Sequence, residues 1–107
     1  MDVSEAIDAL SALAQECRLG AFRLLVRAEP AGLPAGAVAR ALEVPHNTLS
    51  SHLAILSRAG LVTARREGRS VIYRAELARA RGLLAFLLQD CCGGVPELCA
   101  PALESLA

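Results

Sequence analysis

The fold of this chain is decided by one stretch, Pro45-His46-Asn47-Thr48-Leu49-Ser50-Ser51-His52-Leu53-Ala54-Ile55-Leu56-Ser57-Arg58-Ala59-Gly60. Proline suits the first turn of a helix and glycine suits the position just past its end, so Pro45 and Gly60 mark the two boundaries. Leucines at positions 49, 53 and 56 recur at helical spacing and predict one apolar stripe. We therefore expect a short amphipathic helix here.

The opposite side of this helix carries small polar groups and one cation, namely Asn47, Ser50, Ser51 and Arg58. A surface helix that only needs solubility usually carries Glu and Lys there instead. Short donors and acceptors fit a major groove and can hydrogen-bond to base edges and phosphates. An ordinary amphipathic helix would show the same apolar stripe, so the neighbouring segments must decide between the two interpretations.

Length and composition predict a single small, mainly helical domain. The chain has 107 residues, of which 54% are hydrophobic, 3% are aromatic and none is tryptophan, so the core must consist of Leu, Val and Ala. No apolar run reaches the length of a membrane span, and the acidic start Met1-Asp2-Val3-Ser4-Glu5 is unlike a signal peptide. We expect a cytoplasmic protein with no membrane contact.

The charges cluster although the net charge is zero. All 11 basic residues are arginine, and seven of them lie between Arg58 and Arg81 against two acids. All charged residues among the first sixteen positions, and all those from Asp90 onward, are acidic. A basic zone between acidic ends can be an electrostatic footprint for phosphates.

Helical periodicity predicts three helices ahead of residue 45. The first covers about residues 3–16, with an apolar stripe of Val3, Ile7, Leu10 and Leu13. The second covers about residues 17–28, and its side chains expected to face inward are Leu19, Phe22, Leu25 and Val26. The third covers residues 34–42, with Val38, Ala41 and Leu42 expected to face the core. A short connection, Glu43-Val44-Pro45, then leads into the opening helix, which is typical of a helix-turn-helix.

A β-hairpin is expected after Gly60. The segments 61–66 and 70–74 alternate and are rich in β-branched residues, and Glu67-Gly68-Arg69 separates them. Arginines flank the turn on both sides. A basic hairpin beside a recognition helix indicates a wing that contacts the DNA backbone or minor groove, although simple solvent exposure is the alternative.

The last predicted helix, residues 76–90, is apolar around more than half of its circumference. Its apolar residues are Ala80, Leu83, Leu84, Phe86, Leu87 and Leu88. One small domain cannot easily cover so much apolar surface. We expect the first and last helices to pair across a twofold axis, so that a homodimer presents two recognition helices to double-stranded DNA.

The run from Thr48 to Val62, continued by Arg65-Arg66-Glu67-Gly68-Arg69-Ser70-Val71-Ile72-Tyr73, resembles the ArsR-type (ArsR/SmtB) winged helix-turn-helix repressors. The resemblance covers residues 10 to about 73. It implies a homodimeric repressor that leaves its operator when an inducer binds, often a soft metal or metalloid.

The resemblance also has departures. The Cys-x-Cys pair that arsenic and cadmium sensors of the family carry on the helix before the recognition helix is absent from residues 34–42. The histidines that zinc sensors place on the final helix are absent from residues 76–90. The chain has instead Asp90-Cys91-Cys92-Gly93-Gly94-Val95-Pro96-Glu97-Leu98-Cys99, which resembles the C-terminal cysteine site of an arsenite-responsive subgroup.

Three thiols and no imidazole suit a thiophilic ion. A disulfide between the adjacent Cys91 and Cys92 would be strained. Three soft ligands, Cys91, Cys92 and Cys99, fit As(III) or Sb(III), whereas zinc would need a fourth ligand from Asp90 or Glu97. Another soft metal or a redox switch remains an alternative. Cys17, by contrast, is interpreted as a small buried hydrophobic residue.

The residues expected to contact DNA lie on the recognition helix and the wing. We assign base edges or phosphates to Asn47, Thr48, Ser50 and Ser51, and the backbone to Arg65, Arg66 and Arg69. His46 could reach either. For His52, packing against the wing and DNA contact are both open.

We therefore expect a winged helix-turn-helix domain over residues 1–90 and an inducer-binding tail over residues 91–107, acting together as an arsenic-responsive repressor. A thiol reductase is disfavoured, because the chain has no phosphate-binding loop, no motif for an organic cofactor and no His or Lys placed to activate a thiol. A small metal carrier would not need the basic wing. A repressor of the same fold that senses oxidants is the remaining rival.

Overall fold

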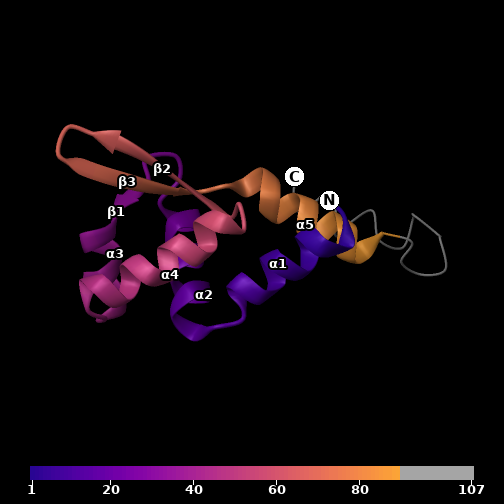
Figure 1. Cartoon of the computed structure of the whole chain (residues 1–107). Coiled ribbons are helices and arrows are strands. Elements are labelled where there is room, and N and C mark those ends of the chain that lie inside the picture. Colours follow the sequence, from indigo (N-terminus) through magenta and orange to yellow (C-terminus); the bar gives the residue numbers. More distant parts are fainter. Residues whose placement is uncertain (90–107) are drawn as a thin grey trace.

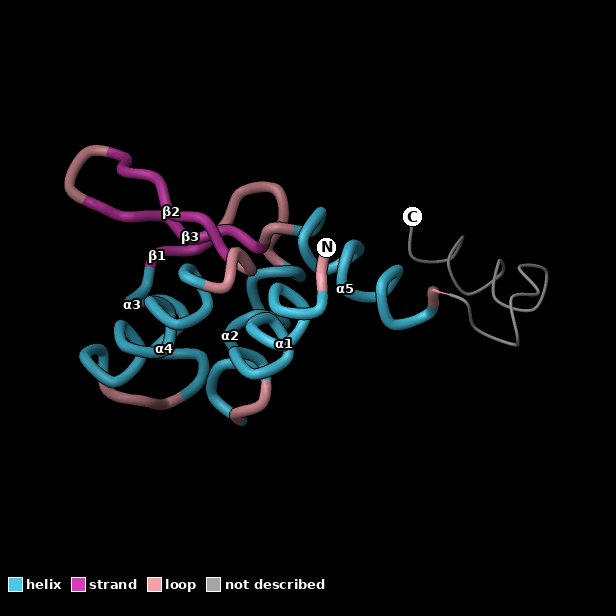
Figure 2. Tube along the Cα trace, turned by 45° about the vertical axis from the view of Figure 1, so that its right-hand side comes forward, coloured by secondary structure: helices cyan, strands magenta, loops and turns pink. Residues whose placement is uncertain are grey.

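The computed structural model describes residues 1–89, which form five helices and a small antiparallel sheet (Figure 1). In chain order the elements are α1 (Val3–Leu13), α2 (Glu16–Arg27), β1 (Leu33–Pro34), α3 (Ala35–Leu42), α4 (His46–Arg58), β2 (Val62–Glu67), β3 (Ser70–Ala75) and α5 (Leu77–Leu88). Helices α2, α3 and α4 lie against one another below the hairpin (Figure 1). The tip of the hairpin and α5 lie at opposite ends of the described chain (Figure 2).

The ends of the helices follow local sequence signals. Side chains cap the first two helices: Asp2 accepts a hydrogen bond from the N–H of Glu5 at 2.8 Å, and Gln15 accepts one from the N–H of Arg18 at 2.9 Å. Pro45 directly precedes α4, one position earlier than the predicted first turn. Gly60 has φ of +78° and lies just past the end of α4, as expected for a glycine that ends a helix.

The sheet has three strands in the order β1-β3-β2, and the predicted hairpin is confirmed. Glu67 pairs with Ser70, so the turn that joins β2 and β3 consists of Gly68 and Arg69. Gly68 supplies the positive φ of +61° that this tight turn requires. Strand β1 was not predicted from the sequence, because two residues are too short to show a strand periodicity; its Leu33 pairs with Tyr73 of β3.

The core is built mainly from alanines and leucines. The largest fully buried side chains are Leu25, Val38, Leu49, Leu53, Leu56 and Leu61, so the predicted stripe of α4 is confirmed. Three residues expected to face inward do not. Leu19 and Val26 are exposed, because Ala21, Phe22 and Leu25 form the buried face of α2, and Ala41 is exposed while its neighbour Ala39 is buried.

Helix α1 is unusual because its small residues are buried and its large apolar residues are exposed. Ala6, Ala9 and Ala12 are buried, whereas Val3, Ile7 and Leu10 are 62%, 59% and 42% exposed. On α5, Leu83 is buried and Leu87 is 51% exposed. Helix α1 contacts α5, so the exposed apolar residues belong to two neighbouring helices. No helix within residues 1–89 is long and apolar enough to span a membrane.

Candidate nucleic-acid interface

Helices α3 and α4 form the helix-turn-helix that the sequence predicted. Helix α3 ends at Leu42, where Glu43 adopts a left-handed conformation with φ of +57°, and α4 begins at His46. Helix α4 packs against both α2 and α3 through its buried leucines. The core therefore fixes which side of α4 faces outward.

The outward face of α4 is polar and mostly unoccupied by intramolecular contacts. Asn47, Ser50, Ser51 and Arg58 are all exposed. The Asn47 side chain accepts from the N–H of Thr48 at 3.0 Å, and the Ser51 hydroxyl donates to the Asn47 carbonyl at 3.4 Å. Within residues 1–89 the side chains of Ser50 and Arg58 have no hydrogen-bond partner, so they can bind DNA without breaking an internal bond.

The two adjacent wing arginines point to opposite faces of the hairpin. Arg66 pairs with Val71, on the same face as the buried Val62 and Ala75, whereas Arg65 pairs with Ile72 on the other face. Alternation along a strand explains this separation. The two arginines therefore extend from different faces of the wing.

Arg65 is held by the protein itself. It forms an ion pair with Glu67 at 2.6 Å, and its Nη2 donates to the carbonyl of Ala31 at 3.4 Å. The same face carries the ion pair between Arg74 and Glu29, at 2.6 Å. The loop that contains Glu29 and Ala31 thus covers this face of the hairpin.

Gly32 shows how closely this loop approaches the sheet. A Cβ at Gly32 would lie 2.5 Å from the Tyr73 carbonyl oxygen, so a larger residue cannot fit without moving the backbone. Its φ of +77° also favours glycine. The opposite face, with Arg66, remains the one turned toward α4.

The beginning of α4 and the tip of the wing share a recess of about 340 Å³. His46 and Ser50 line it from α4, Arg69 and Tyr73 line it from the wing, and Gly36 lines it from α3. Residues predicted to bind DNA from two separate segments, His46, Ser50 and Arg69, are thus brought together. Arg66 and Arg69 are both exposed, and neither has a partner within the described part of the chain.

His52 lies on the opposite flank of α4 from His46 and Ser50. Its ring is half-buried, and its Nδ1 is 3.3 Å from Nη1 of Arg18 in α2. Of the two alternatives for His52, packing against the wing is not what the structure shows, because the helical rotation directs its side chain toward α2; DNA contact by His52 stays a prediction. Thr48 is exposed at the edge of the polar face.

Two arginines that the sequence did not single out connect α4 to other helices. Arg18 contacts His52, as described. Arg79 of α5 donates from Nε to the carbonyl of Ala59 at 3.1 Å and forms an ion pair with Glu5 of α1 at 2.7 Å. Neither role had a local sequence signal, since each contact joins residues far apart in the chain.

The predicted inducer ligands Cys91, Cys92 and Cys99 lie outside the described residues. Among residues 1–89 no cluster of His, Cys, Asp and Glu could hold a metal ion. Cys17 is half-buried against the core, consistent with its predicted packing role. Burial raises the pKa of its thiol, and the charge of the neighbouring Arg18 only partly offsets this effect.

Comparison with known proteins agrees with this geometry. Residues 10–65, more than half of the chain, match a family described as "Helix-turn-helix domain". The transcriptional activator HlyU of Vibrio cholerae is 33% identical over 84 residues, which cover 78% of this chain and 75% of that protein. The chain belongs to the winged helix-turn-helix transcription regulators of the ArsR/HlyU type.

Solved structures of such regulators superpose on this one. The homodimeric winged helix-turn-helix DNA-binding domain of a possible ArsR-family regulator from Mycobacterium bovis has a TM-score of 0.66 at 30% identity, covering 82% of each chain. An ArsR-like regulator from Rhodococcus sp. RHA1 has a TM-score of 0.71 at 27% identity, covering 97% of this chain and 93% of that one. The ArsR/HlyU-type regulator described here is accordingly not an enzyme.

Proposed function

We propose that this ArsR/HlyU-type regulator is a homodimeric repressor that binds operator DNA through α4 and the wing, and that trivalent arsenic releases it. The observation that carries the DNA-binding part is the shared recess between His46 and Ser50 of α4 and Arg69 of the wing. A helix face of small polar groups beside free arginines supplies both base-edge and phosphate contacts.

The exposed apolar residues of α1 and α5 support a homodimer. Val3, Ile7 and Leu10 would be covered by a second copy, together with Leu87. An exposed apolar group of this kind is typical of a protein interface. The related domain from Mycobacterium bovis is homodimeric. A twofold dimer would present two α4 helices to two half-sites about one DNA turn apart.

The chemistry of the cysteine tail supports a thiophilic inducer. Cys91, Cys92 and Cys99 provide three thiolates, which match the three bonds of As(III) or Sb(III). Binding would displace thiol protons. An oxidant-sensing repressor of the same fold is the second candidate, since vicinal thiols are also open to oxidation. Related regulators differ in whether they repress or activate transcription, since one from Xylella fastidiosa is a repressor and HlyU is an activator. Repression by this protein is therefore part of the proposal.

We expect a conformational change in the tail to be transmitted to α4 through α5. The tail follows α5 in the chain, and Arg79 of α5 holds the carbonyl of Ala59 at the end of α4. To convert mostly bound protein into mostly free protein, the ion must favour the released form by about 5 kcal/mol.

The proposal is tested by titrating arsenite onto the protein bound to DNA selected from a random-sequence library, under strictly reducing conditions. Fluorescence anisotropy of labelled DNA should report release of the wild type. A variant with Cys91, Cys92 and Cys99 all changed to Ser should stay bound, and the Cys17→Ser control should behave as the wild type.

Each alternative predicts a different result. An oxidant sensor would stay on DNA when arsenite is added under reduction, and a metal carrier would not select DNA at all. Release of the triple variant by arsenite would show that the cysteine tail is not the inducer site. Mass spectrometry of the reduced protein with arsenite gives the number of ions per dimer.

A protein that binds operator DNA must be in the compartment that contains the genome, so a cytoplasmic location remains our prediction.

A further inference from the structure

Arg18 lies at the junction where α1 ends and α2 begins. Its Nε donates to the carbonyl of Ala12 at 2.6 Å, and its Nη2 donates to the carbonyl of Ser11 at 3.5 Å. These carbonyls are at the C-terminal end of α1, where the helix dipole favours a cation; the Ser11 carbonyl also accepts from the N–H of Ala14 at 3.2 Å. The guanidinium is therefore held firmly on α1.

The same guanidinium also reaches α4. Its Nη1 is 3.3 Å from Nδ1 of His52, across 34 positions of sequence. Arginine has only donors, so Nδ1 of His52 must accept and the ring proton must be on Nε2 in this contact. A single side chain thus links the end of α1 to the middle of α4.

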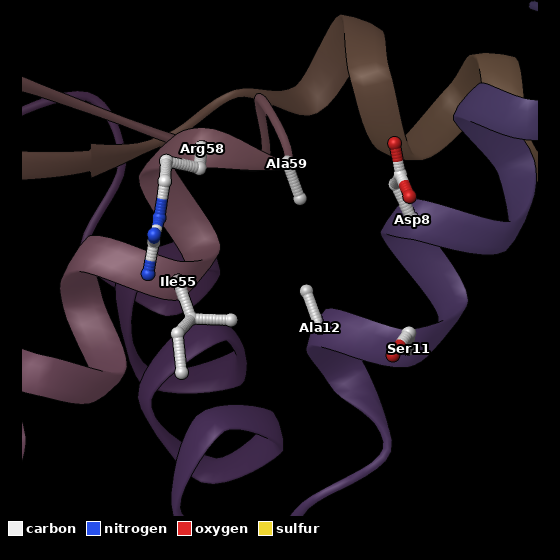
Figure 3. Close-up of a pocket in the computed structure, with 6 residues that line it drawn as sticks. All are labelled: Asp8, Ser11, Ala12, Ile55, Arg58 and Ala59. Carbon is white, nitrogen blue, oxygen red and sulfur yellow. The ribbon is translucent and has the colours of Figure 1, made fainter.

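Small apolar side chains pack where these two helices meet, since Ala12 and Ala59 are both buried in the core. A surface recess of about 310 Å³ lies beside them, lined by Ala12 of α1, by Ile55 of α4 and by Ala59, which directly follows α4 (Figure 3). The apolar contacts are non-directional, and the recess beside them stays open. The contact of Arg18 with His52 supplies a directional constraint beside it.

We infer that Arg18 is a positioning residue for DNA binding, because it fixes α4 relative to α1 through His52. The inference rests on the proposed function, in which α4 reads DNA and α1 joins the two subunits. His52 lies on the flank of α4 away from the wing recess, and Arg18 is half-buried. Arg18 would therefore set the orientation of α4 in the dimer without touching DNA itself.

The test compares DNA affinities of Arg18→Met, His52→Phe and the double variant, with the selected DNA and the full chain. Met keeps the apolar stem of Arg18, and Phe keeps the ring of His52 without an acceptor. Each single variant should bind about tenfold more weakly, the loss expected for one hydrogen bond to a charged group. The double variant should be little weaker than either single one, because both remove the same contact.

Two further measurements separate positioning from other roles. A lost phosphate contact would reduce the slope of log K against log salt by about 0.9, whereas loss of a positioning residue leaves the slope unchanged. His52→Gln should recover much of the affinity, since its amide oxygen can accept from Arg18. Arg23→Met is the matched control, because Arg23 is an exposed arginine of the same helix without a partner within residues 1–89.

The possible results are distinct. If the wild type binds DNA with a steep salt slope but Arg18→Met and His52→Phe bind equally well, the positioning role is wrong and the proposed function stands. If the slope falls in Arg18→Met, Arg18 contacts phosphate and the inference is also wrong. A wild type without a salt slope contradicts the proposed function itself. Should Arg18→Met fail to fold, as judged by circular dichroism, the difference between His52→Phe and His52→Gln decides.

Discussion

Helices α1 and α4 both expose one face, but the two faces differ in kind. Helix α4 buries its leucines and exposes Asn47, Ser50 and Ser51. Helix α1 buries alanines and exposes larger residues such as Ile7. The core alone cannot explain the second arrangement, because a helix stabilised only within this subunit would bury its large apolar residues. The contrast indicates that α4 is presented to a polar ligand and α1 to another apolar surface.

The largest effect is expected from placing a carboxylate on α1. Ile7→Glu should convert the dimer into a monomer, because a charge cannot be buried unpaired in an apolar interface. The monomer should still fold, since Ile7 is 59% exposed in the single chain. Loss of the second half-site should weaken DNA binding by about a hundredfold or more. Light scattering coupled to gel filtration gives the mass, and anisotropy gives the affinity.

The matched control is Ser4→Glu, which adds the same charge to an exposed polar position on the same helix. It should remain a dimer with normal DNA affinity. If the Ile7→Glu variant were still a dimer, α1 would not be the interface, and the exposed apolar residues of α1 would need another explanation.

The same charge on α4 should act differently. Ser51→Glu should leave the dimer intact, because Ser51 is exposed on the polar face, and should weaken DNA binding at least about tenfold by repulsion from phosphates. Melting temperatures should match the wild type. Dissociation of this variant into monomers would mean that α4, too, is covered by protein.

Sequence reasoning predicted α4 well and α1 only in part. The stripe of α4 and its polar face follow from helical spacing, which is a local property. The stripe of α1 was equally visible and was expected at a dimer interface, but the sequence reasoning did not predict that alanines form the buried face of this helix. Leu19 and Val26 were wrongly placed inside, because spacing alone did not show that Ala21, Phe22 and Leu25 form the buried face of α2.

The wing allows a comparison between two neighbouring arginines. Arg66→Ala should lower the salt slope by about 0.9 and weaken binding by roughly fivefold, whatever the DNA sequence, because it removes a phosphate contact. Arg65→Ala should change affinity less than about twofold and reduce the free energy of unfolding by less than about 1 kcal/mol, since its ion pair with Glu67 is exposed. Salt titrations and thermal unfolding measure both. Equal slopes for the two variants would contradict the assignment of faces.

The strand faces of these arginines were beyond sequence reasoning, and their contacts with DNA stay predictions. All of Arg65, Arg66 and Arg69 were predicted to bind DNA, because charge clustering carries no information about strand faces. Strand alternation alone separates Arg65 from Arg66, but which face meets α4 depends on the pairing of β3 with β1 and on the loop that contains Gly32. Arg18 and Arg79 were missed because their contacts are made only by the tertiary fold.

The smallest effect concerns Cys17, which lies on neither of the two faces. Because burial raises the pKa of its thiol, less thiolate is present at a given pH than in an unfolded chain. Alkylation of Cys17 by iodoacetamide near pH 8 should therefore be slower in the folded protein than in urea. Peptide mapping by mass spectrometry separates Cys17 from the other cysteines. Faster reaction in the folded state would contradict the assigned packing role.

Tyr73 gives the protein a built-in optical reporter. It is the single tyrosine of a chain that has no tryptophan, so the intrinsic emission excited near the red edge of its absorption comes from one ring. Tyr73 lines the recess shared by α4 and the wing. Emission from the unlabelled protein therefore monitors the space between the recognition helix and the hairpin, and needs no engineered fluorophore.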